Sequence, residues 1–139
     1  MTPPKDGKKK RSKQEIQKIR AGFEDSLKEI NSFLDQWLEF HKAYKRAYKG
    51  EEFGREDEAR FLDMKSNLAR QHARLTLRLD RDYVGWQSIR PLLSQTVNLA
   101  QMSRLRPEHY DKIERSWHET YIHLNESIGH LRYVIESEG

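Results

Sequence analysis

The chain has 139 residues, enough for one domain with a single hydrophobic core and short for two. Hydrophobic and charged residues each make up 35% of it, a balance that favours amphipathic helices with wide solvated faces over a central sheet. The absence of cysteine excludes disulfides and thiolate chemistry, and no apolar run approaches the roughly 18 residues that span a bilayer. Since the N-terminus has no apolar signal segment either, we expect a cytoplasmic protein, or a nuclear one in a eukaryote.

The N-terminal segment is basic and poor in apolar residues. Residues 1–11 hold two prolines, a glycine and a block of like charge, with no apolar residue after Met1. This composition cannot offset the entropy lost on ordering, so we predict a disordered tail over 1–11 and a single helical domain over 12–139. Through position 13, six basic residues and Asp6 give +5; because the whole chain carries +4, the remainder sums to −1.

A long helix is predicted from Ser12 to about Lys49. Ser12 and Glu15 match a Ser-x-x-Glu capping box, and Gly50 is a natural terminator. Between these signals, bulky side chains recur mostly at steps of three and four. The predicted core positions are Ile16, Ile19, Phe23, Leu27, Ile30, Leu34, Trp37, His41, Tyr44 and Tyr48, with Phe33, Leu38 and Phe40 on the flanks.

A second helix is predicted from Glu56 to about Asp80, because negative charge at 56–58 suits a helix start. Its predicted core positions are Phe61, Met64, Leu68, His72, Leu75 and Leu79.

Two further helices are predicted after an interruption at 80–88. Pro91 fits the first turn of a shorter helix capped by Ser88, and Pro107 fits the first position of a last helix. The expected core positions are Leu92, Leu93, Val97, Ala100 and Leu105 in the shorter helix, and Tyr110, Ile113, Trp117, Tyr121, Leu124, Ile128, Leu131 and Ile135 in the last.

Together these elements predict an all-α fold, an antiparallel bundle of about four helices with up-down-up-down topology. The predicted helices differ in length, since the first spans roughly 37 residues and the third roughly 16. We therefore expect part of the first helix to project beyond its neighbours and to offer apolar surface to another molecule.

A row of arginines marks the second helix. Residues 70, 74, 78 and 81 are arginines on the face opposite Leu68 and Leu75, and segment 64–106 carries eight Arg or Lys against two Asp. Guanidinium groups in a row can follow phosphates without reading sequence, so the row and the tail predict a nucleic-acid contact. For the tail, the alternatives are contact with an anionic membrane, a nuclear import signal or a solubilising role. For the row, the alternative is a solvated face whose arginines pair with acidic side chains. The residues predicted to bind nucleic acid are Lys8, Lys9, Lys10, Arg11, Lys13, Arg70, Arg74, Arg78 and Arg81.

The last helix carries two features on its outward side. Ile122, Gly129 and Tyr133 form an apolar and small strip that predicts a protein interface, with ordinary surface exposure as the alternative. Beside this strip, Glu119, His123, Glu126 and His130 have metal-ligand spacing. Because they point away from the core, we expect no metal site there.

His41 and His72 fall on the predicted apolar faces of the first and second helices, where they could meet. We interpret both as core histidines with satisfied hydrogen bonds.

Arg104 and His109 are separated by four residues, and this spacing resembles the Arg-x4-His motif of the all-helical HEPN ribonucleases. The resemblance implies RNA cleavage by the two side chains at a dimer interface. It covers these two residues only; Leu105 stands where that family usually has a polar residue, and Pro107 interrupts the helix that the motif would need.

No nucleophile triad, phosphate loop or inward pair of acids is present, so we expect no enzyme, cofactor, metal or small-molecule substrate. The favoured function is an assembly or adaptor subunit that self-associates or docks on a protein and contacts nucleic acid. The alternatives are a purely protein-binding helical adaptor and a HEPN-like ribonuclease.

Overall fold

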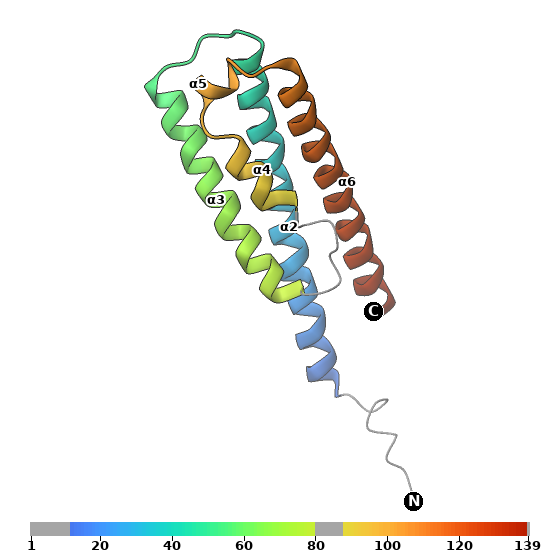
Figure 1. Ribbon diagram of the computed structural model, residues 1–139. Coiled ribbons are helices and arrows are strands. Elements are labelled where there is room, and N and C mark those ends of the chain that lie inside the picture. Colours follow the sequence, from blue (N-terminus) through green and yellow to red (C-terminus); the bar gives the residue numbers. More distant parts are fainter. Residues whose placement is uncertain (1–11, 80–87, 139) are drawn as a thin grey trace, which may run out of the picture.

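The computed structural model describes residues 12–79 and 88–138, and over these ranges the chain is helical and free of strands. The helices are α2 (Lys13–Tyr48), α3 (Arg55–Leu79), α4 (Ile89–Gln95), α5 (Leu99–Met102) and α6 (Pro107–Glu138) (Figure 1). The all-α prediction is therefore confirmed for this part of the chain, and the predicted tail lies outside it. None of these helices combines the length and the apolar character needed to cross a membrane.

The boundaries of the long helices follow local signals. The hydroxyl of Ser12 accepts a hydrogen bond from the amide of Glu15 at 3.1 Å, and Gly50, just beyond α2, has a φ of 90° in the left-handed region. At the start of α3, the carboxylate of Asp57 accepts a bond from the amide of Gly54 at 2.8 Å. Pro107 is the first residue of α6, as predicted.

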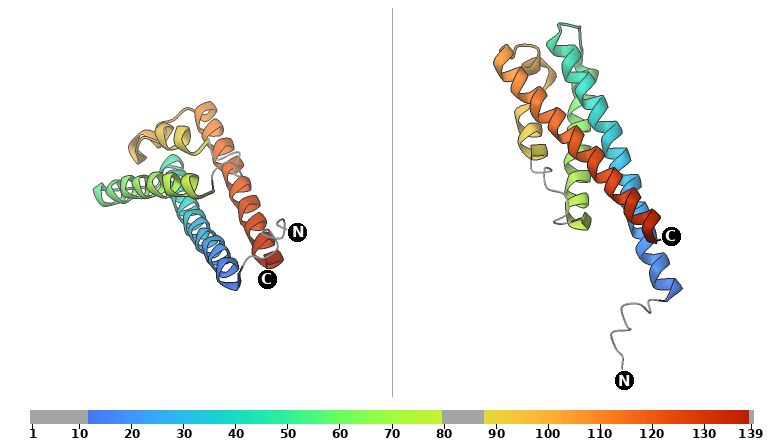
Figure 2. Two further views of the ribbon diagram at one scale, coloured as in Figure 1. Left: turned by 90° about the horizontal axis from the view of Figure 1, so that it is seen from below. Right: turned by 90° about the vertical axis from the view of Figure 1, so that its right-hand side faces the viewer.

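The central element is α2, which packs against α3 on one side and α6 on another (Figures 1 and 2). Both neighbours run antiparallel to it. Phe40 stacks on Phe61 near the start of α3, whereas Glu29 pairs with Arg74 near its end. The short helices α4 and α5 lie between α3 and α6 and complete only part of the fourth side of the bundle.

The core face of α2 differs from the prediction. Its buried bulky residues include Phe33 and Phe40, which were predicted to flank the core, whereas Leu34 and Tyr48 are half-buried. The reason is tertiary, since α2 is covered from two directions by α3 and α6 and its most buried line lies between them. The buried residues of α2 are Ser26, Ile30, Phe33, Trp37, Phe40, Tyr44 and Ala47.

Trp37 and Trp117 join α2 to α6 by a reciprocal contact. The indole N–H of Trp37 donates to the carbonyl of Trp117 at 3.3 Å, and that of Trp117 donates to the carbonyl of Trp37 at 3.0 Å. The two rings lie nearly parallel, with centroids 6.2 Å apart. Both polar indole groups are thereby satisfied inside the core.

The predicted third helix is wrong as one element, because residues 96–98 separate α4 from α5. The hydroxyl of Thr96 is buried and donates to the carbonyl of Leu92 at 2.9 Å, closing α4. Val97, predicted as core, is exposed, and Leu99 and Met102 are buried in its place. Ser88 stands at the N-cap of α4, but its side chain makes no capping bond.

Glu58 of α3 supports the start of α5. Its carboxylate accepts bonds from the amides of Leu99 at 2.7 Å and Ala100 at 3.1 Å. These are two of the free donors at the helix N-terminus. Asn98, the N-cap residue, accepts a bond from the amide of Gln101 at 2.7 Å, so Glu58 and Asn98 cap α5 together.

The first turns of α2 extend beyond the end of α3 and past the end of α6 (Figures 1 and 2). Ile16, Ile19 and Phe23 are half-buried there. The length mismatch predicted from the sequence is present in the structure.

Candidate nucleic-acid interface

Arg70, Arg74 and Arg78 form a row on the exposed side of α3. The side chains of Phe61, Leu68 and Leu75 point into the core. The arginines recur every four residues and lie on the solvent-facing side of the helix. At the usual rise of a helix the row extends about 12 Å. The outward placement predicted from the sequence is thus observed.

One carboxylate serves two of these arginines. Glu29 of α2 lies 3.2 Å from Nε of Arg74 and 3.4 Å from Nη1 of Arg78, through its two different oxygens. Arg70 instead donates to the uncharged side-chain carbonyl of Asn67. The row therefore keeps an excess of positive charge. Its two ion pairs join exposed guanidinium groups to one carboxylate whose side chain is 16% exposed.

Only part of the predicted set lies within the described residues. Lys13 is the first residue of α2 and is exposed, whereas Lys8, Lys9, Lys10, Arg11 and Arg81 lie outside the described ranges. A shallow cleft beside the row is lined by Arg78, by Asp25 and by Lys18, a cation that the sequence analysis did not single out. The juxtaposition of Lys18 with Arg78 depends on how α2 and α3 pack, so no local pattern signals it.

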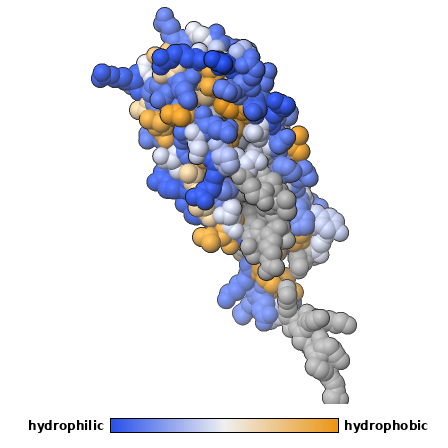
Figure 3. All heavy atoms as spheres, viewed as in Figure 1, coloured by the Kyte–Doolittle hydropathy of each residue, from blue (hydrophilic) through white to orange (hydrophobic). Residues whose placement is uncertain are grey.

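The predicted interface strip of α6 faces outward. Ile122 is 48% exposed and Tyr133 69%, and a side chain at Gly129 would meet open space. Hydrophobic residues on the face shown in Figure 3 form separate patches within a largely hydrophilic surface. The strip is available for contact with another molecule.

The Glu and His residues beside the strip are also directed outward. His123 lies 3.6 Å from Glu126, and Glu119 and His130 are exposed. Among the residues that the structure describes, no group of three potential ligands is arranged to hold a metal.

His41 and His72 do not meet. Gln71 lies next to Ser32 on α2, so His72 packs about nine residues along α2 from His41, or roughly 14 Å at the usual rise. His41 instead faces α6, where it lies 2.8 Å from Glu114 and stacks on Trp117 with ring centroids 4.0 Å apart.

Glu114 centres a polar cluster that the sequence analysis missed. Its carboxylate accepts a bond from the hydroxyl of Tyr44 at 2.9 Å as well as contacting His41. Burial opposes ionisation of Glu114, but the bonds to His41 and Tyr44 outweigh it and lower its pKa. Burial, followed by the charge of Glu114, raises the pKa of Tyr44, so this hydroxyl stays protonated and donates.

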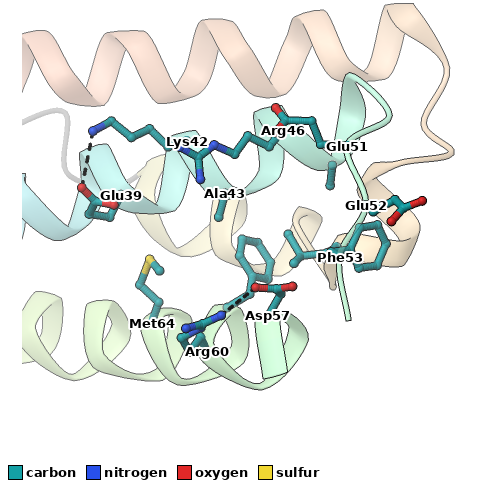
Figure 4. A pocket seen from close by; sticks show the side chains of 13 residues that line it. Glu39, Lys42, Ala43, Arg46, Glu51, Glu52, Phe53, Asp57, Arg60 and Met64 are labelled. Atoms are coloured by element: carbon teal, nitrogen blue, oxygen red, sulfur yellow. Dashed lines mark hydrogen bonds and ion pairs between the residues drawn. The ribbon is translucent and has the colours of Figure 1, made fainter. Parts of the chain in front are cut away.

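A cleft of about 430 Å³ opens between the end of α2 and the start of α3 (Figure 4). Apolar side chains such as Phe53, Phe61 and Met64 meet a rim of both charge signs. The rim includes ion pairs between Arg60 and Asp57 at 2.7 Å and between Lys42 and Glu39 at 3.5 Å. Because its charges are mixed and partly paired, the cleft does not favour an anion as the arginine row does.

Arg104 and His109 have different surroundings. Nε of Arg104 donates to the carbonyl of Ala100 at 3.2 Å, whereas His109 lines a groove with Leu105 and Lys112 from which Arg104 is absent. Within one chain the described structure does not bring the two side chains to one site.

Comparison with known proteins gave no match to a family model, to a curated protein or to a solved structure.

Proposed function

We propose that this protein is a non-enzymatic assembly or adaptor subunit that self-associates or docks on a protein partner and contacts nucleic acid without sequence specificity. The proposal places it in the cytoplasm, or in the nucleus of a eukaryote. The observation that carries the nucleic-acid contact is the row of Arg70, Arg74 and Arg78, three exposed guanidinium groups with Glu29 as their one acidic partner in the described structure. Phosphates spaced along a strand complement such a row, and the basic tail adds charge.

The test is binding of a labelled oligonucleotide of arbitrary sequence, measured by fluorescence anisotropy across a salt series. We expect affinity to fall steeply as salt rises, because binding releases counterions from the phosphates. Arg74→Glu with Arg78→Glu should weaken binding at least tenfold at low salt, and should reduce the slope of log affinity against log salt by about two for a duplex.

A matched control separates the row from net charge alone. Lys112→Glu with Arg132→Glu changes the net charge by the same amount at two exposed positions of α6. We expect this control to retain most of the affinity. Equal losses in both double variants, or no loss in the α3 variant, would remove the row as the contact surface.

The exposed apolar strip of α6 favours a second candidate, an adaptor that binds protein alone. It predicts no oligonucleotide binding at low salt by the wild-type chain, together with loss of a copurifying protein when Ile122 and Tyr133 are both replaced by Glu. Copurification from the native host, with identification of bound protein and nucleic acid, separates the two candidates.

A further inference from the structure

The outer side of α3 carries a second apolar face. Leu62 is 47% exposed and Leu77 is 85% exposed, although α3 already buries Phe61, Leu68 and Leu75 on its opposite side. This outer face consists of positions from Leu62 to Leu77 that recur at steps of three and four residues. They therefore share one side of the helix. They are Leu62, Ser66, Ala69, Ala73 and Leu77, and all five are exposed.

No described element covers this outer face. Helix α3 contacts α2, α4 and α5 through other sides, and it stands at the edge of the bundle (Figures 1 and 2). Leu77 is the most exposed of the large hydrophobic residues described. Covering this leucine with another apolar surface lowers the free energy of the system, because apolar surface is removed from water.

The spacing of the outer face is self-complementary. Leu62 and Leu77 lie at equal distances from the midpoint between Ala69 and Arg70, and Ser66 and Ala73 are related in the same way. In an antiparallel pair of α3 helices with a two-fold axis at this midpoint, Leu62 of each copy faces Leu77 of the other. The short side chain of Ala69 at the axis does not obstruct their approach.

The charges beside the outer face match the same arrangement. Asp63 flanks its first half and Arg74 flanks its second half on the same side of the helix. Arg70 lies at the midpoint, beside its own copy in such a pair, and donates to Asn67 of its own helix. In an antiparallel two-fold pair, the same flank of the two helices lies together, and the two helices run in opposite directions. Asp63 of each copy therefore lies within one turn of Arg74 of the other. A parallel two-fold pair would instead place the charged flanks of the two copies on opposite sides of the contact, where Asp63 and Arg74 do not meet.

We propose that a second copy of this chain docks on the outer face of α3, antiparallel, with Leu62 and Leu77 as reciprocal contacts. This inference rests on the self-association in the proposed function and names its surface and register. It shares Arg74 with the arginine row, so the dimer mass is measured in the absence of oligonucleotide and oligonucleotide binding is measured separately.

Light scattering tests the surface. The wild-type chain should have twice the monomer mass of 16.7 kDa at high concentration, and Leu62→Glu with Leu77→Glu should return it to the monomer mass. Ile122→Glu with Tyr133→Glu, the matched change on α6, should leave the dimer intact, and circular dichroism should show equal helix content in both variants. A wild-type monomer overturns the proposal, as does a dimer that dissociates in the α6 variant and persists in the α3 variant.

Cross-linking tests the register, because the chain has no native cysteine. Ala69→Cys stands beside the two-fold axis and should give a covalent dimer on oxidation. Ala59→Cys lies on the same side of α3, but its two copies would be about 30 Å apart along the pair and should remain reduced. Equal cross-linking of both variants would overturn the antiparallel register.

A charge exchange provides a rescue. Asp63→Arg places like charges together and should weaken the dimer at least severalfold, and adding Arg74→Asp should restore it. If the double exchange dissociates the dimer as completely as the single one, the predicted pairing of Asp63 with Arg74 is wrong. Oligonucleotide binding by a chain that proves monomeric would overturn this inference while leaving the nucleic-acid contact supported.

Discussion

Glu114 illustrates how one side chain can organise an interface without leaving a signal in the sequence. Its side chain is 28% exposed, and its neighbours in the chain form no recognisable motif. Its partners His41 and Tyr44 lie on α2, some 70 residues earlier. Its lowered pKa shows that the folded state favours the carboxylate. A pH dependence of stability follows from this preference.

Replacing Glu114 by Gln should lower the free energy of unfolding by about 1 to 2 kcal/mol at pH 7, because bonds to a charged acceptor are lost. Since the folded pKa is depressed, the contribution of Glu114 is complete above its ordinary pKa of 4.5 and disappears as the pH falls through the folded value. Thermal melts of both chains should therefore differ at pH 7 and differ by less at pH 3, below the ordinary pKa.

Glu119→Gln is the control for this prediction, because it makes the same chemical change at an exposed position of α6. It should shift the melting temperature little at either pH. A Glu114→Gln effect that is as large at pH 3 as at pH 7 would show that the carboxylate charge is not its cause.

At the scale of elements, α5 depends on a neighbour for its existence. A helix of four residues cannot offset the cost of its own nucleation, and two of its free amides are satisfied by Glu58 of α3. The break at 96–98 lets Leu99 and Met102 turn into the core, which an uninterrupted helix through Val97 would not do.

Glu58→Ala should destabilise the protein by about 1 to 2 kcal/mol and should loosen α5 selectively, because two amides lose their acceptor. Chemical denaturation measures the first effect, and amide hydrogen exchange at Leu99 and Ala100 measures the second. Glu56→Ala, an exposed change in the same turn of α3, is the control. Unchanged protection of both amides in Glu58→Ala would mean that the cap does not hold α5.

At the scale of the whole molecule, α2 is the helix on which the others assemble. It contacts α3, α5 and α6, whereas α4 and α5 are short and complete only part of one side. Stability should therefore be unevenly distributed along the chain.

We expect amide hydrogen exchange to be slowest in residues 30–44 of α2, where opening requires most of the core to separate. Residues 89–102 should exchange faster, through local opening of α4 and α5. Equal protection of the two segments would indicate that the short helices belong to the same cooperative unit as α2.

The sequence by itself determined the helices and their outward faces, because these depend on neighbours within one or two turns. Ser12, Gly50 and Pro107 mark helix ends that the structure confirms. The spacing of three and four residues also predicted correctly that Arg74 and Arg78 face outward.

Only the tertiary structure decided which side of each helix meets which neighbour. Phe33 and Phe40 became the centre of the core because α2 is covered from two directions, a geometry that periodicity within α2 does not contain. The sharing of Glu29 by two arginines and the contact of His41 with Glu114 join residues 45 and 73 positions apart. Such contacts arise from the packing of whole helices, and local propensity carries no information about them.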